Sequence, residues 1–328
     1  MPSRYPRTWH ENCVAAVLIL LVQSHVVVAN DFAMCESAVR QLEASKQDAQ
    51  QKGNLFPIHP TSSLAFLHIA KSGGSSFSLA ISRSVRDILR CQIVPELDYP
   101  ENKKAVGKVA NLSLGRSICV TGQRSGVFES SEAMTTTGFI HKYGKDVSII
   151  SMARKPLDRI RSMFIHDYNH GPKRVNCAKS LESYLRLCCL KRKCTCQAAS
   201  SLCKKYTNFA SMRTEGVKGL QMTRFVGVTH LLELSYCVFL WKFQLVDRFQ
   251  MECVKTHFKP STLLLNTKEH TRKSAKKFRP PEILCNNTCR HFLTHDEALY
   301  ELTMKRFWDD VARMLRPNGL GCREVVNN

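Results

Sequence analysis

The stretch of sequence that decides the fold is Phe66-Leu67-His68-Ile69-Ala70-Lys71-Ser72-Gly73-Gly74-Ser75-Ser76-Phe77. An apolar run, Ser63 to Ile69, predicts a buried strand, and a Gly-Gly turn follows it. The next apolar positions recur at helical spacing and are Phe77, Ile81, Val85 and Ile88. This order of strand, glycine turn and helix favours anion binding, because glycines let the backbone approach a ligand and helix amides point at it.

The chemistry of the turn narrows the kind of anion site. Lys71 adds a point charge, and the serines add hydrogen-bond donors. The G-x-x-x-x-G-K-[ST] spacing of a Walker A loop is absent, which disfavours a nucleotide triphosphatase. The alternative is a turn that uses glycine for its geometry and serine as a helix N-cap.

The rest of the chain alternates between strand and helix patterns. Apolar runs predict further strands at Ser117–Thr121, Val147–Met152 and Phe225–Val228. Helices are predicted to begin at Pro156, to span Leu231–Leu245, and to run from about His295 to Leu315. The alternation predicts a parallel α/β sheet.

A second signature lies where the strand Val147–Met152 gives way to a helix. Arg154 is expected at the carboxyl edge of the sheet, where ligands of α/β folds bind, and its planar guanidinium suits a phosphate. Ser162, two turns into the helix, adds a donor, and Arg159 is expected to help hold the loop. The alternative is an exposed arginine paired with Asp158 or with solvent.

The two segments together resemble the Golgi carbohydrate sulfotransferases, most closely the heparan sulfate 2-O- and 6-O-sulfotransferase group. The first resembles their 5′-phosphosulfate loop, F-x-H-I-P-K-T-G-G-T-S/T, with Ala70 in place of proline and serines in place of threonines at Ser72 and Ser75. The second resembles their 3′-phosphate signature, R-[DNHK]-P-x-x-R-x-x-S. Weaker similarities at Arg224–Thr229 and Asp296–Glu301 extend the resemblance over about residues 63 to 316.

The resemblance implies a co-substrate, 3′-phosphoadenosine 5′-phosphosulfate (PAPS), and no metal. It implies that PAPS is held by Lys71, Ser72, Gly73, Gly74, Ser75, Ser76, Arg154 and Ser162. Lys71 would also be catalytic, because it would stabilise the bridging oxygen as the sulfuryl group leaves. The implied fold is a P-loop-like parallel sheet flanked by helices. The resemblance does not cover residues 171–205, which their cysteines and basic residues predict to be a Cys-rich helical insertion.

The general base departs from the pattern of the family. A histidine follows a glycine after the second strand in the 2-O-sulfotransferases, whereas Gln123 follows Gly122 here, and glutamine cannot accept the proton. The neighbouring candidates are Glu129, Glu132 and His141, of which Glu129 is the expected base.

The amino-terminal sequence predicts entry into the secretory pathway. Arg4 and Arg7 precede an apolar run that starts at Cys13 and continues, with a short polar break, to Ala29. This pattern fits a cleavable signal peptide, and it is at the short edge of the ~20 residues of a membrane span, so a type II anchor stays open. The predicted locations are the Golgi lumen or the outside of the cell.

Fourteen of the 15 cysteines follow Cys13, and an even, high count predicts disulfides in an oxidising compartment. Six of them lie in the insertion, where a zinc site is the alternative, although the spacing is poor for one. A disulfide between Cys285 and Cys289 would close a short loop and is a further candidate pair. Sequons at Asn111 and Asn286 predict glycosylation in the same compartment.

A net charge of +21 on 328 residues, 44% of them apolar, predicts one globular core that attracts polyanions. The expected domains are a signal or anchor (1–29), a stem (30–62), the sulfotransferase domain (63–316) and a tail (317–328). The expected partner is an anionic glycan acceptor, with a membrane if the anchor is uncleaved. A catalytically impaired glycan-binding protein is the second hypothesis. A nucleic-acid-binding protein is the third, and the signal segment and the cysteines count against it.

Overall fold

The computed structural model describes residues 28–44, 63–69, 72–74, 76–77, 80–81, 116–121, 124–131, 135–170, 216–245, 253 and 287–326. The five strands in these ranges form one sheet in the order β2-β3-β1-β4-β5. The strands are β1 (Ser63–Leu67), β2 (Arg116–Thr121), β3 (Arg124–Ser131), β4 (Ser148–Ala153) and β5 (Phe225–Val228). Neighbours among β3, β1, β4 and β5 are parallel, and β2 is antiparallel to β3. The predicted α/β class is confirmed.

Strand β3 was not predicted from the sequence. Its residues, Arg124 to Ser131, contain mostly polar side chains and one glycine, so they lack the apolar run by which the other strands were found. In the sheet β3 lies between β2 and β1, with Ser63 opposite Val127 and Leu67 opposite Ser131. A polar strand in this place shows that pairing with two neighbours can fix a strand that local sequence does not indicate.

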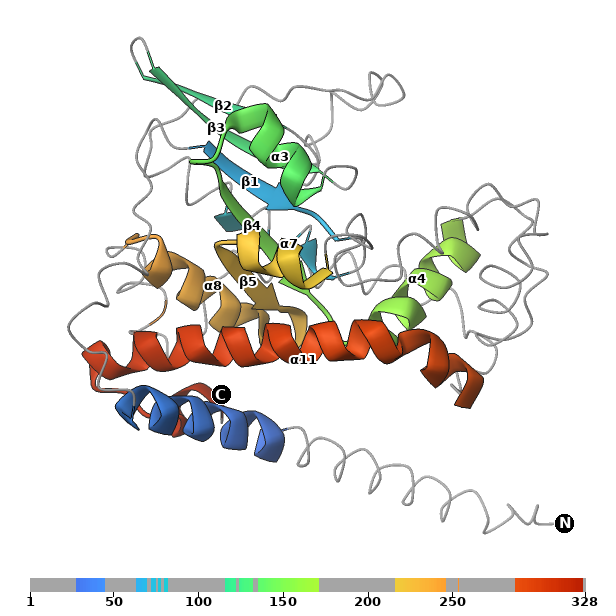
Figure 1. The fold of residues 1–328 in the computed structure, drawn as a ribbon, viewed down its shortest axis with the longest axis vertical. Helices are drawn as coiled ribbons and strands as arrows, with labels where there is room; N and C mark the ends of the chain where they lie inside the picture. The colour runs from blue at the N-terminus through green and yellow to red at the C-terminus, as the bar shows by residue number, and fades with distance from the viewer. Residues whose placement is uncertain are drawn as a thin grey trace, which may run out of the picture. The chain divides into compact units, whose positions relative to one another are not determined.

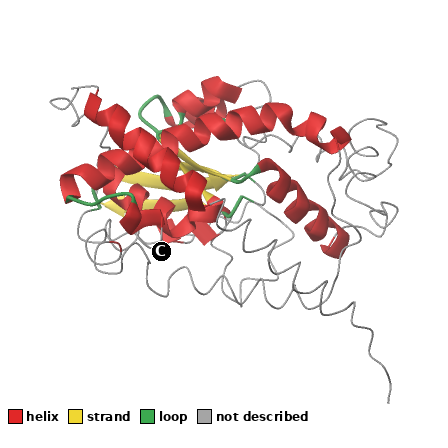
Figure 2. Cartoon of the chain, turned by 90° about the horizontal axis from the view of Figure 1, so that it is seen from below, coloured by secondary structure: helices red, strands yellow, loops and turns green. Residues whose placement is uncertain are grey.

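Helices cover both faces of the sheet (Figures 1 and 2). They include α3 (Thr136–Tyr143), α4 (Pro156–His170), α7 (Gly216–Met222), α8 (Leu232–Lys242) and α11 (Asn287–Leu315). The α4 start is where the sequence predicted it, and α8 is preceded by a 3₁₀ turn, Thr229–Leu231. Helix α11 begins at Asn287, eight residues before the predicted His295, and Leu293 in this added part is buried.

Successive side chains of a strand point to opposite faces of the sheet, and each face carries its own hydrophobic core. Ala65, Leu67 and Ile149 belong to a cluster with Phe139 of α3 and Leu220 of α7. Figure 1 shows α3 and α7 over this face. The opposite face carries an aromatic cluster in which Phe77 and Phe239 contact each other and both contact Phe225; its members are Phe66, Phe77, Phe225, Phe239 and Phe243.

The chain divides into two compact units, one of residues 52–307 and one that joins residues 1–51 with 308–328. In the second unit, residues 28–44 form a helix, and its buried Cys35 is bonded to Cys322. The stem expected at 30–62 and the tail expected at 317–328 are therefore joined in part by a disulfide. Cysteine counts alone do not give this pairing, because partners 287 residues apart leave no local signal.

A second disulfide joins Cys237 of α8 to Cys253. All four cysteines whose side chains are described are therefore oxidised, which confirms that the protein contains disulfides. The insertion at 171–205, Cys285 and both sequon asparagines lie outside the described residues, and residue 289 lies in α11. Within the described ranges, no helix has both the length and the apolar character needed to cross a membrane.

Candidate functional site

The carboxyl ends of the parallel strands β1, β4 and β5 bring three segments of the chain to one edge of the sheet. The turn at Ser72 and Gly73 follows β1, Arg154 follows β4, and Thr229 follows β5. Because β1 and β5 flank β4 on either side, these segments come from three neighbouring strands. This is the edge at which α/β sheets bind ligands.

Thr229 connects the three segments by hydrogen bonds. Its hydroxyl oxygen lies 2.8 Å from the carbonyl oxygen of Ser72 and 2.9 Å from that of Ala153, the last residue of β4. One hydroxyl hydrogen serves both acceptors, so the bond is shared. The effect is to hold the turn after β1 against the end of β4, directly beside Arg154.

The position of Thr229 is itself fixed by the contact between β5 and α8. The Ser235 hydroxyl accepts a hydrogen bond from the Val228 amide at 2.8 Å and donates to the Val228 carbonyl at 3.1 Å. A Cβ on Gly227 would lie 2.5 Å from the Met152 sulfur and 2.8 Å from the Ser235 Cβ. Glycine at 227 therefore lets α8 approach β5 closely enough for these bonds.

The turn after β1 requires both of its glycines, for different reasons. Gly73 has a φ of +71°, a left-handed conformation that side chains rarely adopt, and a Cβ there would lie 3.0 Å from the Thr229 methyl group. A Cβ on Gly74 would lie 2.1 Å from the buried His68 ring. The Phe77 amide donates to the Gly73 carbonyl at 3.1 Å, so helical bonding starts immediately after the turn.

Ser72 supplies a polar atom without a protein partner at this edge. Its side chain is fully buried, and its Oγ makes no hydrogen bond to any residue that the structure describes. A buried hydroxyl without a partner costs about 1–3 kcal/mol. A ligand oxygen beside the turn would remove this cost.

Arg154 and Ser162 are both half-buried on the segment that follows β4. Burial lowers the pKa of Arg154 below its usual value, and the Asp158 carboxylate acts in the opposite direction. Asp158 also lies 3.7 Å from Arg161, one turn along α4. A half-buried guanidinium gains from an anionic ligand because its charge has lost part of its hydration.

Helix α4, which carries Ser162, is held to α11 by a buried ion pair. Arg159 and Asp296 are 1% and 3% exposed, and their nearest charged atoms are 3.9 Å apart. Burial raises the pKa of Asp296 to about 7, Arg159 acts to lower it, and Glu297 adds to the rise. Arg159 was expected to help hold the loop after β4, and the structure pairs it with Asp296 of α11.

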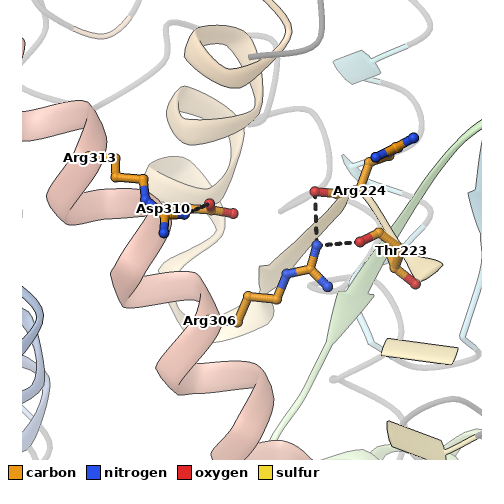
Figure 3. Close-up of polar contacts among 5 residues, drawn as sticks. All are labelled: Thr223, Arg224, Arg306, Asp310 and Arg313. Carbon is orange, nitrogen blue, oxygen red and sulfur yellow. Dashed lines mark hydrogen bonds and ion pairs between the residues drawn. The ribbon is translucent and has the colours of Figure 1, made fainter. Parts of the chain in front are cut away.

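A further arginine of α11 fixes the entry to β5. The Arg306 guanidinium donates to the carbonyl oxygen of Leu220. It also donates to the carbonyl oxygens of Thr223 and, at 3.1 Å, of Arg224, as Figure 3 shows. These carbonyls lie at the end of α7 and in the segment that leads into β5, and that of Leu220 also accepts from the Thr223 amide at 3.2 Å. A cation at the end of a helix also suits the helix dipole.

Other predicted site residues are placed in part or lie outside the described residues. Lys71, Ser75 and Gln123 lie outside them, and Ser76 is half-buried in the helix after the turn. Glu129 lies in β3 opposite Ala65 of β1, two residues before the end of the strand. The described residues thus bring Ser72, Gly73, Gly74 and Arg154 to one edge and leave Lys71 and Glu129 as predictions.

His141 lies at the other end of the sheet. It is exposed near the end of α3, and the chain then enters β4 at Ser148, the amino end of that strand. The six residues of β4 separate this end from the Arg154 end by roughly 16 Å. Thr229 and His230 were not assigned by sequence reasoning, although the segment Arg224–Thr229 had been noted.

No group of His, Cys, Asp and Glu side chains suited to a metal occurs in the part of the chain that the structure describes. Comparison of the chain with protein-family models, with curated proteins and with solved structures gave no match.

Proposed function

We propose that the protein is a PAPS-dependent sulfotransferase that transfers a sulfuryl group to a hydroxyl of an anionic, glycosaminoglycan-like carbohydrate. The observation that carries the proposal is the junction at Thr229, where the glycine turn after β1 and the segment of Arg154 meet. A bisphosphorylated nucleotide needs two anion sites on one surface. The glycine turn and Arg154 are suited to these two roles.

The local chemistry supports a 5′-phosphosulfate at the turn. Glycine at 73 allows the positive φ of the turn, glycine at 74 leaves room for the His68 ring, and the buried Ser72 hydroxyl has a hydrogen bond to give. Lys71 would supply a cation at the bridging oxygen as negative charge develops there. Arg154 would bind the 3′-phosphate through its planar fork, and Ser162 would donate to the same group.

The finer fold proposed is P-loop-like, with a Cys-rich helical insertion at 171–205. The proposed location is the lumen of the Golgi, or the outside of the cell after signal cleavage. The two disulfides support this location, because disulfides persist in oxidising compartments. The net charge of +21 fits an anionic acceptor.

A glycan-binding protein of the same fold with impaired catalysis is the second candidate. Gln123 favours it, since this residue stands where the sulfotransferase pattern has a basic histidine. The two functions are separated by incubating the protein with sulfur-labelled PAPS and a panel of desulfated and partly sulfated glycosaminoglycans. Label in any glycan supports the enzyme. Glycan binding by a protein that transfers no label supports the binder.

A further inference from the structure

The proposed transfer needs a general base, and the described edge of the sheet offers one that the sequence pattern did not assign. Gln123 cannot accept a proton, and His141 lies at the amino end of β4. His230 directly follows Thr229, the residue whose hydroxyl contacts both the turn after β1 and the end of β4. Its side chain is exposed.

A tyrosine from α11 contacts the ring of His230. The hydroxyl of Tyr300 lies 3.3 Å from Nδ1 of His230, and the Tyr300 ring packs against the core cluster on the α3 and α7 face of the sheet. A partner on Nδ1 selects the tautomer of an imidazole. When Nδ1 donates its hydrogen to the tyrosine oxygen, Nε2 is the basic nitrogen.

We propose that His230 is the general base of the sulfuryl transfer and that Tyr300 orients it, an inference that rests on the proposed function. The imidazole takes the proton of the acceptor hydroxyl, and the oxygen lone pair forms the new O–S bond. The bond between sulfur and the bridging oxygen breaks, and its electron pair stays on the 5′-phosphate. The products are the sulfated carbohydrate and 3′-phosphoadenosine 5′-phosphate (PAP), with the proton on His230.

The test compares His230→Ala with His141→Ala, an exposed histidine from the opposite end of β4. Steady-state transfer of label and calorimetric binding of PAP are measured for both. We expect His230→Ala to lower kcat by on the order of 10²–10⁴-fold while the Kd for PAP stays at its wild-type value, because the base touches only the acceptor. Unchanged PAP binding also shows that the variant is folded.

Rescue by added imidazole is a second readout, and it would not occur if His230 had only a structural role. Imidazole in the buffer should restore part of the kcat of His230→Ala and leave wild type and His141→Ala unchanged. Tyr300→Phe keeps the aromatic packing and loses the hydroxyl, so its kcat should fall less than that of His230→Ala.

The inference is overturned if wild type transfers label and His230→Ala retains its kcat. It is also overturned if Glu129→Gln abolishes transfer while His230→Ala does not, which would assign the base to β3. Failure of the proposed function looks different, because wild type itself would then bind no PAP and transfer no label to any glycan.

Discussion

The hydroxyl of Thr229 lies 2.8 Å from the carbonyl oxygen of Ser72, a residue 157 positions earlier in the chain. The same hydroxyl is 2.9 Å from the carbonyl oxygen of Ala153, so one side chain after β5 contacts both the turn after β1 and the last residue of β4. Both acceptors are backbone atoms, which means that the contact fixes the path of the chain rather than one side chain. The turn and Arg154 are thereby held in a common arrangement.

Removal of this hydroxyl should disturb both halves of the nucleotide site. Thr229→Val has nearly the same shape but leaves the Ser72 and Ala153 carbonyls without their donor, at a cost of about 1–3 kcal/mol in the free energy of unfolding. It should also raise the KM for PAPS. Thr229→Ser keeps the donor and loses only the methyl group beside Gly73, so it should recover most of both quantities. Urea unfolding and steady-state kinetics measure them. Equal effects of Val and Ser would show that the hydroxyl is unimportant.

The burial of Asp296, which outweighs its ion pair with Arg159, predicts a pH dependence of stability. The pKa of Asp296 is raised to about 7 in the folded protein from 3.8, so the folded state holds the proton more tightly than the unfolded state. The stabilisation is complete below the unfolded value and is lost as the pH rises through about 7. Between pH 5 and pH 8 the free energy of unfolding should fall by on the order of 2–3 kcal/mol from this group.

Asp296→Asn is the matched control for this dependence, because asparagine resembles the protonated carboxyl group and does not titrate. Urea unfolding at pH 5 and pH 8 should show a smaller difference for the variant than for wild type. The same difference in both proteins would mean that Asp296 is not the titrating group.

The disulfide between Cys35 and Cys322 should stabilise the unit that contains it without affecting nucleotide binding, since the proposed nucleotide residues belong to the other unit. Replacing both cysteines by serine should cost about 2–5 kcal/mol of stability and leave the Kd for PAP unchanged. Thermal unfolding and calorimetry measure the two effects. Peptide mapping after alkylation without reductant should find this pair and Cys237–Cys253 linked. Free alkylated thiols at these four positions would contradict the assignment.

Lys71 and Arg154 should affect different kinetic constants. Charge develops on the bridging oxygen only during transfer, so Lys71→Ala should mainly lower kcat. Arg154 should contact the 3′-phosphate equally before and during the reaction, so Arg154→Ala should mainly raise the KM for PAPS. Arg154→Lys should recover only part of this loss, because a point charge lacks the fork. Wild-type kinetics in both alanine variants would remove these residues from the site.

Much of the fold was predictable because the apolar strands are marked locally. Phe225–Val228 matches β5 without change, and Pro156 is the start of α4. Strand β3 escaped prediction because its polar residues are fixed by pairing with two neighbours. The disulfide to Cys322 and the contacts of Thr229 were also missed, since they join residues far apart in the sequence.

The placement of the candidate site residues was predictable where they lie in short motifs. Gly73, Gly74 and Arg154 stand at the carboxyl edge as expected, because a strand followed by a helix places its connecting turn there. His230 gave no such signal, as a single histidine after a short strand has no characteristic spacing. Its proposed role depends on the contacts that Thr229 makes with distant segments and on Tyr300, which only the folded chain brings to it.

The most direct test of the central claim is a calorimetric titration of the protein with PAP, the nucleotide product, which requires neither an acceptor nor turnover. We predict saturable binding at a single site, weakened by on the order of 2–3 kcal/mol in Arg154→Ala, or roughly 30- to 150-fold in Kd. The absence of binding by folded wild-type protein at millimolar PAP would contradict the sulfotransferase assignment.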